Sequence, residues 1–184
     1  NVAVEHINLE IHKGDFVCLI GTSGSGKTTT IRNMMGFIRP DRGISTVNGL
    51  DSWKESAVIM KHVSYVPGEI AFPALKTGTE FLKTQAKYLG VTDFGYMNHV
   101  IELLQLDPTA NLKRMSKGMK QKIGIVCAFM DTNSDILILD EVTQSLSHDN
   151  RKVLYNLIEK FKGEGRSIIL ISHDLDEAIQ LTDS

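Results

Sequence analysis

Cysteine is scarce in this chain, and neither charge sign is in strong excess. Only Cys18 and Cys127 occur among 184 residues, each inside an apolar run. Two distant cysteines make neither a disulfide framework nor a zinc site, so we expect small buried side chains in a protein of a reducing compartment. Lysine and arginine together number 20 against 22 acidic residues, which argues against a nucleic-acid-binding surface with its strong basic excess.

Long apolar runs are missing as well. No run approaches the roughly 20 residues that a helix needs to span a bilayer. The N-terminal segment 1–11 also lacks the basic start and apolar centre of a signal peptide. Any work at a membrane is therefore expected to be that of a peripheral partner. The weak alternation at 2–11 predicts a strand-like start, and together with the abrupt stop at 181–184 it makes us expect truncated ends.

What is present is an ordinary globular composition, 42% apolar and 23% charged, in a chain long enough for one domain with a core. Short apolar runs bounded by turn residues predict strands, and apolar residues at helical spacing predict helices. Strands are expected at 16–20, 63–66, 136–139 and 167–171. Helices are expected at 27–35, 79–90, 96–106, 119–130 and 149–162, and after His173.

The alternation of strands and helices indicates an α/β fold with a mainly parallel sheet covered by helices. The stretch 70–127 is helical in pattern, and we interpret it as an inserted α-helical subdomain. Residues 1–69 and 128–184 are then the two parts of the core, in a single domain that spans 1–184.

A glycine-rich loop lies between the first predicted strand and the first predicted helix. Its glycines let backbone N–H groups turn inward around phosphate oxygens, at the positive end of a helix. Lys27 is expected to reach the β- and γ-phosphates, Thr28 a Mg²⁺ ion and Thr29 the α-phosphate. The alternative is a flexible loop beside a surface lysine, and the flanking strand and helix argue against it. GTSGSGKTT matches G-x-x-x-x-G-K-S/T, and the predicted site comprises Gly21, Thr22, Ser23, Gly24, Ser25, Gly26, Lys27, Thr28 and Thr29.

The run ILILDE places two adjacent carboxylates at the end of a predicted buried strand. Phosphoryl transfer from a magnesium nucleotide needs an acid near the metal, at the end of a neighbouring strand. Asp140 is therefore the predicted metal-side acid, and Glu141 the group that orients or deprotonates the attacking water. The alternative is an acid that merely caps the next helix, and the phosphate loop argues against it.

Two further segments carry weaker signals. MSKGMKQK places Ser116 and the Gly118 N–H at a helix N-terminus, which is a second anion-binding arrangement. Taken alone, this segment is better interpreted as a turn that starts a helix. His173 follows the strand SIILI. A histidine there is more often structural, but its place after the strand that follows ILILD lets it reach the γ-phosphate.

In this order, the motifs resemble those of the ATP-binding subunit of ABC transporters along essentially the whole chain. GTSGSGKTT resembles Walker A, ILILDE resembles Walker B with its catalytic glutamate, and MSKGM stands at the place of the family signature. His173 matches the switch histidine. The resemblance implies a P-loop NTPase fold of ABC type that hydrolyses ATP with Mg²⁺, with Lys27, Glu141 and His173 as catalytic residues. The segment SKGMKQK is similar to a subgroup of bacterial exporters of drugs, antibiotics or lipids.

The resemblance also implies partners. Two copies, or one copy and a related ATPase subunit, are expected to dimerise head to tail. Each ATP then lies between Walker A of one copy and Ser116 and Gly118 of the other, so that ATP closes the dimer and hydrolysis reopens it. The helical insert passes this motion to an integral-membrane subunit. The implied location is cytoplasmic and peripheral, on the inner face of the cell membrane, with no nucleic-acid partner.

Three positions depart from the family pattern. Gly68 stands where the family has a glutamine that contacts Mg²⁺ and the attacking water. The following Glu69 is either a substitute oxygen ligand or a solvent-facing loop acid. Val142 replaces a proline, and Ser147 replaces an aspartate that couples the two sites, so we expect reduced or loosely coupled turnover with ATP binding retained.

No aromatic residue precedes Phe16, so the family's adenine-stacking residue is expected beyond the N-terminal end. We therefore expect ATP binding to be weak, with little base preference.

Two other interpretations stay open. One is a soluble ABC-type ATPase that acts on ribosomes or DNA, although such chains usually carry tandem copies, coiled coils or basic arms that this sequence does not show. The other is a weakly catalytic, regulatory nucleotide-binding module, which Gly68 and Ser147 favour.

Overall fold

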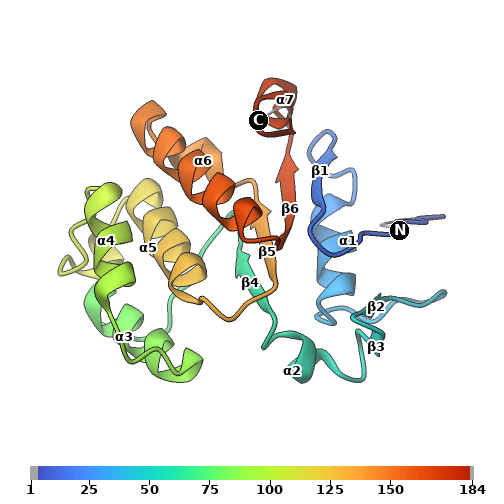
Figure 1. Cartoon of the computed structure of the whole chain (residues 1–184), viewed down its shortest axis with the longest axis horizontal. Helices are drawn as coiled ribbons and strands as arrows, with labels where there is room; N and C mark the ends of the chain where they lie inside the picture. The colour runs from blue at the N-terminus through green and yellow to red at the C-terminus, as the bar shows by residue number, and fades with distance from the viewer. Residues whose placement is uncertain (1–3, 183–184) are drawn as a thin grey trace.

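A four-stranded sheet forms the centre of the computed structural model, which describes residues 4–182 (Figure 1). Every neighbouring pair of its strands is parallel. The order across the sheet is β1 (Phe16–Ile20), β6 (Ser167–Ser172), β5 (Ile136–Asp140) and β4 (Val63–Val66). A short antiparallel pair forms a second sheet, β2 (Thr46–Val47) with β3 (Leu50–Asp51). The predicted mainly parallel sheet is confirmed.

Most helices appear where the apolar spacing predicts them, with small shifts at their ends, whereas a short helix at 56–59 was not predicted. The helices are α1 (Lys27–Met34), α2 (Ser56–Ile59), α3 (Gly78–Leu89), α4 (Gly95–Leu103), α5 (Lys117–Met130), α6 (His148–Gly163) and α7 (Leu175–Thr182). Two 3₁₀ turns complete the set, η1 (Leu112–Arg114) and η2 (Val142–Ser145). The helices α3, α4 and α5 follow one another along the chain between β4 and β5.

The predicted strand-like start is wrong for the residues that the structure describes. Residues 4–11 form no strand, and the side chains of Ile7 and Leu9 are about half exposed. Positions 2 and 3 lie outside the described residues. An extended segment becomes a strand only where a neighbouring edge supplies a ladder of hydrogen bonds. Alternation alone is therefore not enough to make a strand here.

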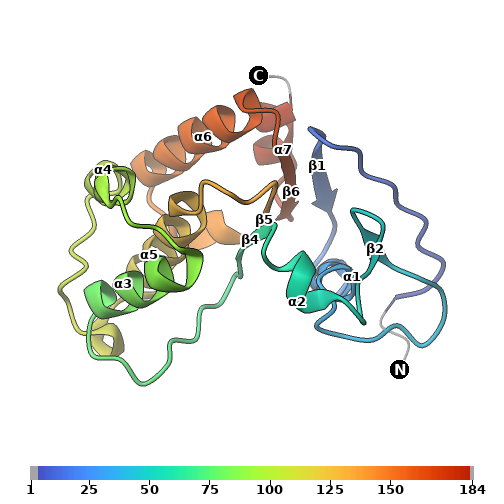
Figure 2. The ribbon, with the colours of Figure 1, turned by 60° about the horizontal axis from the view of Figure 1, so that its bottom comes forward.

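The sheet separates two hydrophobic cores, because successive side chains of a strand point to opposite faces. Figure 2 shows the two groups of helices on opposite sides of the strands. The larger core contains residues of α3, α4, α5 and α6. The strands β5 and β6 contribute Leu137, Leu139, Ile168 and Leu170 to it. The smaller core, with residues from α1 and α2, receives from the same strands Ile136, Ile138, Ile169 and Ile171. Both faces are thus covered, as parallel sheets require.

Helix α5 is buried over more of its surface than its sequence pattern indicates. The apolar spacing of 119–130 places five residues on one face, of which Ile123, Val126 and Met130 are buried and Met119 and Cys127 are partly buried. The structure also buries Ile125 and Phe129, which point to another side. The reason is the position of α5, which packs against β4 as well as α3 and α4.

The parallel arrangement places the carboxyl ends of β1, β5 and β6 at one edge of the sheet. The phosphate loop follows β1, Glu141 follows β5, and His173 follows β6. Segments that are far apart in the sequence therefore meet at this edge, which is the usual place for a ligand in such sheets.

Candidate active site

The phosphate loop turns sharply between β1 and α1. Gly24 and Gly26 have φ values of 81° and 94°, which only glycine adopts without strain. Gly26 directly precedes α1, and no side chain caps that helix end. The first N–H groups of α1 are therefore available to an anion.

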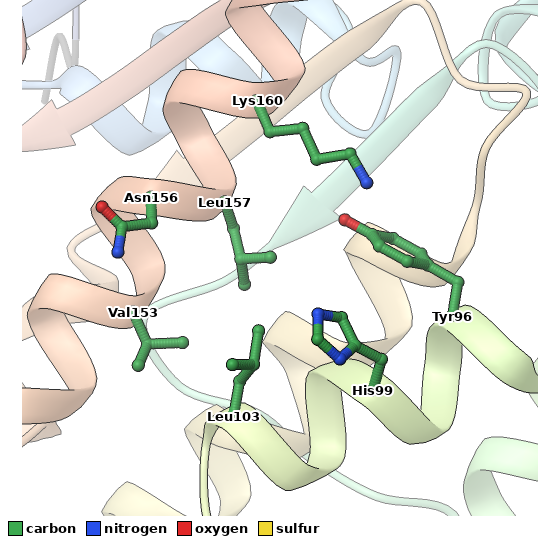
Figure 3. A pocket seen from close by; sticks show the side chains of 7 residues that line it. All are labelled: Tyr96, His99, Leu103, Val153, Asn156, Leu157 and Lys160. Atoms are coloured by element: carbon green, nitrogen blue, oxygen red, sulfur yellow. The ribbon is translucent and has the colours of Figure 1, made fainter.

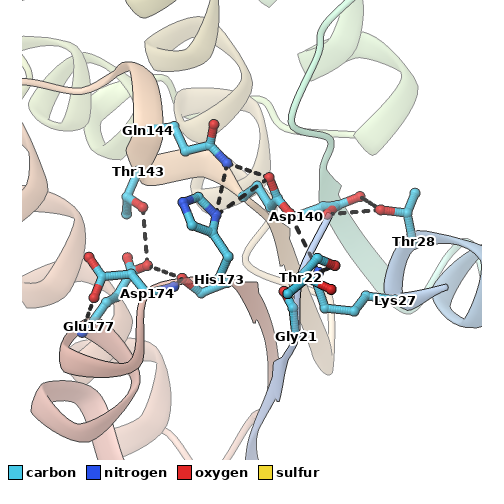
Figure 4. Close-up of polar contacts among 12 residues, drawn as sticks. Gly21, Thr22, Lys27, Thr28, Asp140, Thr143, Gln144, His173, Asp174 and Glu177 are labelled. Atoms are coloured by element: carbon cyan, nitrogen blue, oxygen red, sulfur yellow. Dashed lines mark hydrogen bonds and ion pairs between the residues drawn. The ribbon is translucent and has the colours of Figure 1, made fainter. Parts of the chain in front are cut away.

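Lys27 is folded back onto its own loop. Its Nζ donates to the carbonyl oxygens of Gly21 at 2.6 Å and Thr22 at 2.9 Å (Figure 4). It also lies 3.8 Å from Glu141 Oε1, with only 9% of the lysine side chain exposed. The predicted phosphate-binding lysine is thus held at the loop beside the predicted water-orienting acid.

Asp140 joins the phosphate loop to the central strand. The Thr28 hydroxyl donates to Asp140, at 3.0 Å to Oδ2 and 3.3 Å to Oδ1. The Tyr65 hydroxyl at the end of β4 also donates to Oδ2, at 3.3 Å. Burial raises the pKa of Asp140, and the two hydroxyls partly oppose that shift. The two residues predicted for the metal therefore lie in contact.

Glu141 occupies a left-handed backbone position, φ 51°, directly after β5. Its N–H donates to the carbonyl oxygen of Ile171 at 2.9 Å, which ties this turn to β6. Its Oε2 lies 3.9 Å from His173 Nδ1. The Gln144 amide Nε2 donates to the same Oε2 and lies 3.3 Å from His173 Nδ1 (Figure 4).

The second anion-binding arrangement is built as a helix start. Ser116 Oγ accepts from the Met119 N–H at 3.2 Å and caps α5. A Cβ at Gly118 would lie 2.5 Å from the Ser145 carbonyl oxygen, so only glycine fits this approach of α5 to η2. Among residues 4–182 no hydrogen bond or ion pair joins Ser116 or Gly118 to the phosphate loop. Within one chain, the structure does not bring these two predicted sites together.

The three departures from the family pattern have structural counterparts. A Cβ at Gly68 would lie 2.9 Å from the carbonyl oxygen of Asp140, so a glutamine there requires the backbone to move. The Glu69 side chain is 91% exposed and lies 3.9 Å from Lys117, which favours the solvent-facing interpretation. Val142 is buried in η2. Ser147 caps α6 and accepts from the Asn150 N–H at 3.4 Å.

Sequence reasoning missed Glu177, a buried carboxylate behind the site. Its Oε2 accepts from Ser172 Oγ at 2.6 Å and Thr143 Oγ1 at 3.1 Å. Its Oε1 accepts from the Tyr155 hydroxyl at 3.2 Å, and burial together with this carboxylate raises the pKa of Tyr155 to about 12. In the sequence Glu177 looks like an ordinary acid in the first turn of a helix. The contacts of Tyr65 and Gln144 were missed for the same reason, since no local pattern marks them.

A hollow of about 180 Å³ lies away from the strand ends, between α4 and α6 (Figure 3). Lys160 Nζ stands 4.1 Å from the centre of the Tyr96 ring at its side. None of its lining residues belongs to a predicted motif: Tyr96, His99, Leu103, Val153, Asn156, Leu157 and Lys160.

The described residues include neither a membrane-spanning helix nor a cluster of metal-binding side chains. Within residues 4–182, no helix combines the length and the apolar character needed to cross a membrane. The same part of the chain holds no group of three or more histidine, cysteine or acidic side chains placed to bind a metal ion.

Comparison with known proteins gives consistent matches. A family model described as ABC transporter matches residues 4–144. Over 98% of its length the chain is 33% identical to the bacitracin transport ATP-binding protein BcrA of Bacillus licheniformis, of which it covers 60%. Over 99% of its length it is 33% identical to the arabinose import ATP-binding protein AraG 1 of Burkholderia ambifaria, of which it covers 38%. The chain thus spans less than two thirds of the length of these relatives.

A solved structure gives the same result for the fold. The ATP-binding subunit of an ABC transporter aligns with a TM-score of 0.88 and 28% identity, over 97% of this chain and 76% of that one.

Proposed function

Because the chain belongs to the ABC transporter family, we propose that it is an ATP-binding and ATP-hydrolysing subunit that powers a transporter. The observation that carries the proposal is the hydrogen bond from Thr28 to Asp140, at 3.0 Å. It joins the phosphate loop to the strand-end acid across 112 positions of sequence. The glycine-rich loop, the Thr28 and Asp140 oxygens and the Glu141 carboxylate thus share one edge of the sheet, which supports a nucleotide site there.

The residues at this edge fit a magnesium ion. Thr28 and Asp140 offer a hydroxyl and a carboxylate, the hard oxygen ligands that Mg²⁺ prefers, and Mg²⁺ commonly takes its other ligands from water and substrate phosphates. The raised pKa of Asp140 reflects a carboxylate whose charge is poorly compensated by its surroundings, and a cation beside it relieves that cost. When bound, Mg²⁺ neutralises charge on the β- and γ-phosphates.

We assign the hydrolytic step to Glu141. The oxygen of water forms a bond to the γ-phosphorus, while the bond from that phosphorus to the β–γ bridging oxygen breaks. The proton of the attacking water passes to Glu141 and then to solvent, and the products are ADP and inorganic phosphate. Lys27 leaves its loop carbonyls for the phosphates, and His173 donates a hydrogen bond to the γ-phosphate.

The signature segment is assigned to a second copy. Ser116 and Lys117 are exposed, and Ser116 and Gly118 lie at the positive end of α5. We propose that they bind the γ-phosphate held by the phosphate loop of a partner, which is either a second copy or a related ATPase subunit. This arrangement explains why neither residue contacts the phosphate loop of its own chain.

The helices between β4 and β5 are assigned to coupling. We propose that 70–127 acts as a helical subdomain that passes dimer closure to an integral-membrane subunit, on the cytoplasmic face of the cell membrane. Export of a drug, antibiotic or lipid is inferred from the segment SKGMKQK. The bacitracin transport relative supports this inference, whereas the arabinose import relative shows that the wider family also includes importers.

The proposal is tested by the steady-state ATPase activity of Glu141→Gln. We expect turnover to fall on the order of 100-fold while ATP binding persists, because the amide cannot take the proton from water. Glu69→Gln is the matched control, since Glu69 is a solvent-facing acid, and it should retain the parental rate. Parental activity in Glu141→Gln would show that Glu141 does not have this role.

A second candidate is a weakly catalytic regulatory module. The observation in its favour is Gly68, which offers no side chain to the metal or the water and leaves no room for one beside Asp140. ATPase activity of the complete, partner-bound protein distinguishes the two, because a regulatory module hydrolyses ATP slowly even with its partner.

A further inference from the structure

We propose that Gln144 is a positioning residue that holds Glu141 and His173 together and fixes His173 in the tautomer that carries its proton on Nε2. The proposal rests on the hydrolytic function assigned above. It concerns a position of η2 that lies outside the phosphate loop, the strand-end acids and the switch histidine. Gln144 also provides a side-chain amide at this site, which Gly68, at the position of the family's glutamine, cannot provide.

The geometry places the amide between the two groups. Gln144 and His173 come from η2 and from the end of β6, and their side chains point toward each other (Figure 4). Nε2 of Gln144 donates to Glu141 Oε2 and stands 3.3 Å from His173 Nδ1. Glu141 and His173 themselves are 3.9 Å apart, too far for a direct hydrogen bond. The amide is therefore the link between them.

The chemistry of the amide decides which partner donates. The nitrogen of a glutamine side chain has two hydrogens to donate and accepts none. The reverse orientation would set the amide oxygen against a carboxylate oxygen, which also only accepts. With Nε2 facing both groups, His173 Nδ1 must accept, so the neutral ring carries its proton on Nε2.

The consequence is a donor, Nε2–H, on a side chain that is partly exposed to solvent. The His173 side chain is 54% exposed, and its Nε2–H is free to meet an incoming γ-phosphate. The charged groups around it are Glu141, the neighbouring Asp174 and, beyond Glu141, Lys27 at 3.8 Å from Oε1. Among residues 4–182, the side-chain amide that contacts both Glu141 and His173 is that of Gln144.

Kinetics of Gln144→Ala is the first test. We expect kcat to fall roughly 10-fold, as for other groups that orient a catalytic side chain, while KM for ATP changes little. Gln144→Glu should lose more, because a carboxylate cannot donate and repels Glu141. Gln180→Ala, at an exposed position of α7, should match the parent. A parental kcat in Gln144→Ala, or a loss confined to KM, would overturn the proposal.

Nitrogen NMR of the histidine rings is the second test, and it needs no activity. In the nucleotide-free parent we expect His173 Nδ1 to resonate as an unprotonated nitrogen and Nε2 as a protonated one, with His173→Ala identifying the signals. Gln144→Ala should give mixed tautomers. An unchanged ring pattern in Gln144→Ala contradicts the proposal. If the parent shows no ATPase activity, the proposed function fails, and the NMR result still decides the role of Gln144.

Discussion

Two buried carboxylates at the same edge of the sheet, Asp140 and Glu177, are both 5% exposed and yet have opposite surroundings. Glu177 accepts from three hydroxyls on three different elements: η2, α6 and the end of β6. Asp140 accepts from two hydroxyls, and burial still raises its pKa. Glu177 is thus closed by protein donors, whereas Asp140 is left with a cost that a cation can relieve. The difference supports a structural role for Glu177 and the proposed metal-binding role for Asp140.

Asp140→Asn should have the largest effect and should change activity and stability in opposite directions. We expect magnesium-dependent ATPase to fall on the order of 100-fold, because an amide is a poor ligand for Mg²⁺. Thermal unfolding of the nucleotide-free chain should shift upward, because the variant no longer buries a poorly compensated charge. The measurements are steady-state turnover and a melting curve.

The pH dependence of stability tests whether the charge of Asp140 is poorly compensated. Because the folded pKa of Asp140 is raised, the folded state binds its proton more tightly than the unfolded state does. The free energy of unfolding therefore falls as pH rises from about 4, the ordinary aspartate range, through the raised pKa. Asp140→Asn should lose this part of the pH dependence. An asparagine variant less stable than the parent at neutral pH would refute the comparison.

Glu177→Gln should have the opposite effect on stability. The amide nitrogen would face hydroxyls that now donate to a carboxylate, so we expect the free energy of unfolding to fall by about 1–3 kcal/mol in urea denaturation. Turnover should fall less than in Asp140→Asn, since Thr143 and Ser172 merely adjoin the catalytic segments. Asp176→Asn, exposed on the same helix, is the control and should stay within about 0.5 kcal/mol of the parent. Stabilisation by Glu177→Gln would show that the two acids are alike.

Ser147 should give the smallest change. Ser147→Ala removes the cap of α6 and should cost about 1 kcal/mol. Ser147→Asp keeps a capping oxygen, so its stability should match the parent, and its ATPase rate should rise because a charged group is restored at the predicted dimer contact. If the rate of the aspartate variant equals that of the parent, Ser147 does not limit coupling.

Much of the fold and part of the site could be predicted from local patterns. The strand 63–66 was predicted with its observed bounds, because a short apolar run before Pro67 and Gly68 has few other solutions. The phosphate loop, Asp140 and Glu141 are parts of contiguous motifs that set their own backbone geometry. That Thr28 and Asp140 lie close together was expected because parallel strands end at one edge of the sheet, but the acid does not follow a neighbouring strand, since β6 lies between β1 and β5.

Other features depend on partners far away in the sequence. Tyr65 and Asp140 are 75 positions apart, and Thr143 and Glu177 are 34 apart. Nothing around Glu177 distinguishes it from the exposed Asp176 beside it. The wide burial of α5 likewise depends on β4, α3 and α4, and the segment 4–11 forms no strand because no edge pairs with it.

The sequence by itself therefore determined the four strands of the main sheet, most of the helices, the glycine-rich loop and the identity of the strand-end acids, because each depends on neighbours within a few residues. Only the tertiary structure decided which acid is surrounded by hydroxyls and which groups Gln144 contacts. It also shows that a side chain at position 68 would lie too close to the Asp140 carbonyl oxygen. The physical reason is that hydrogen bonding and close packing depend on which atoms meet in space, and the order of the strands sets those meetings.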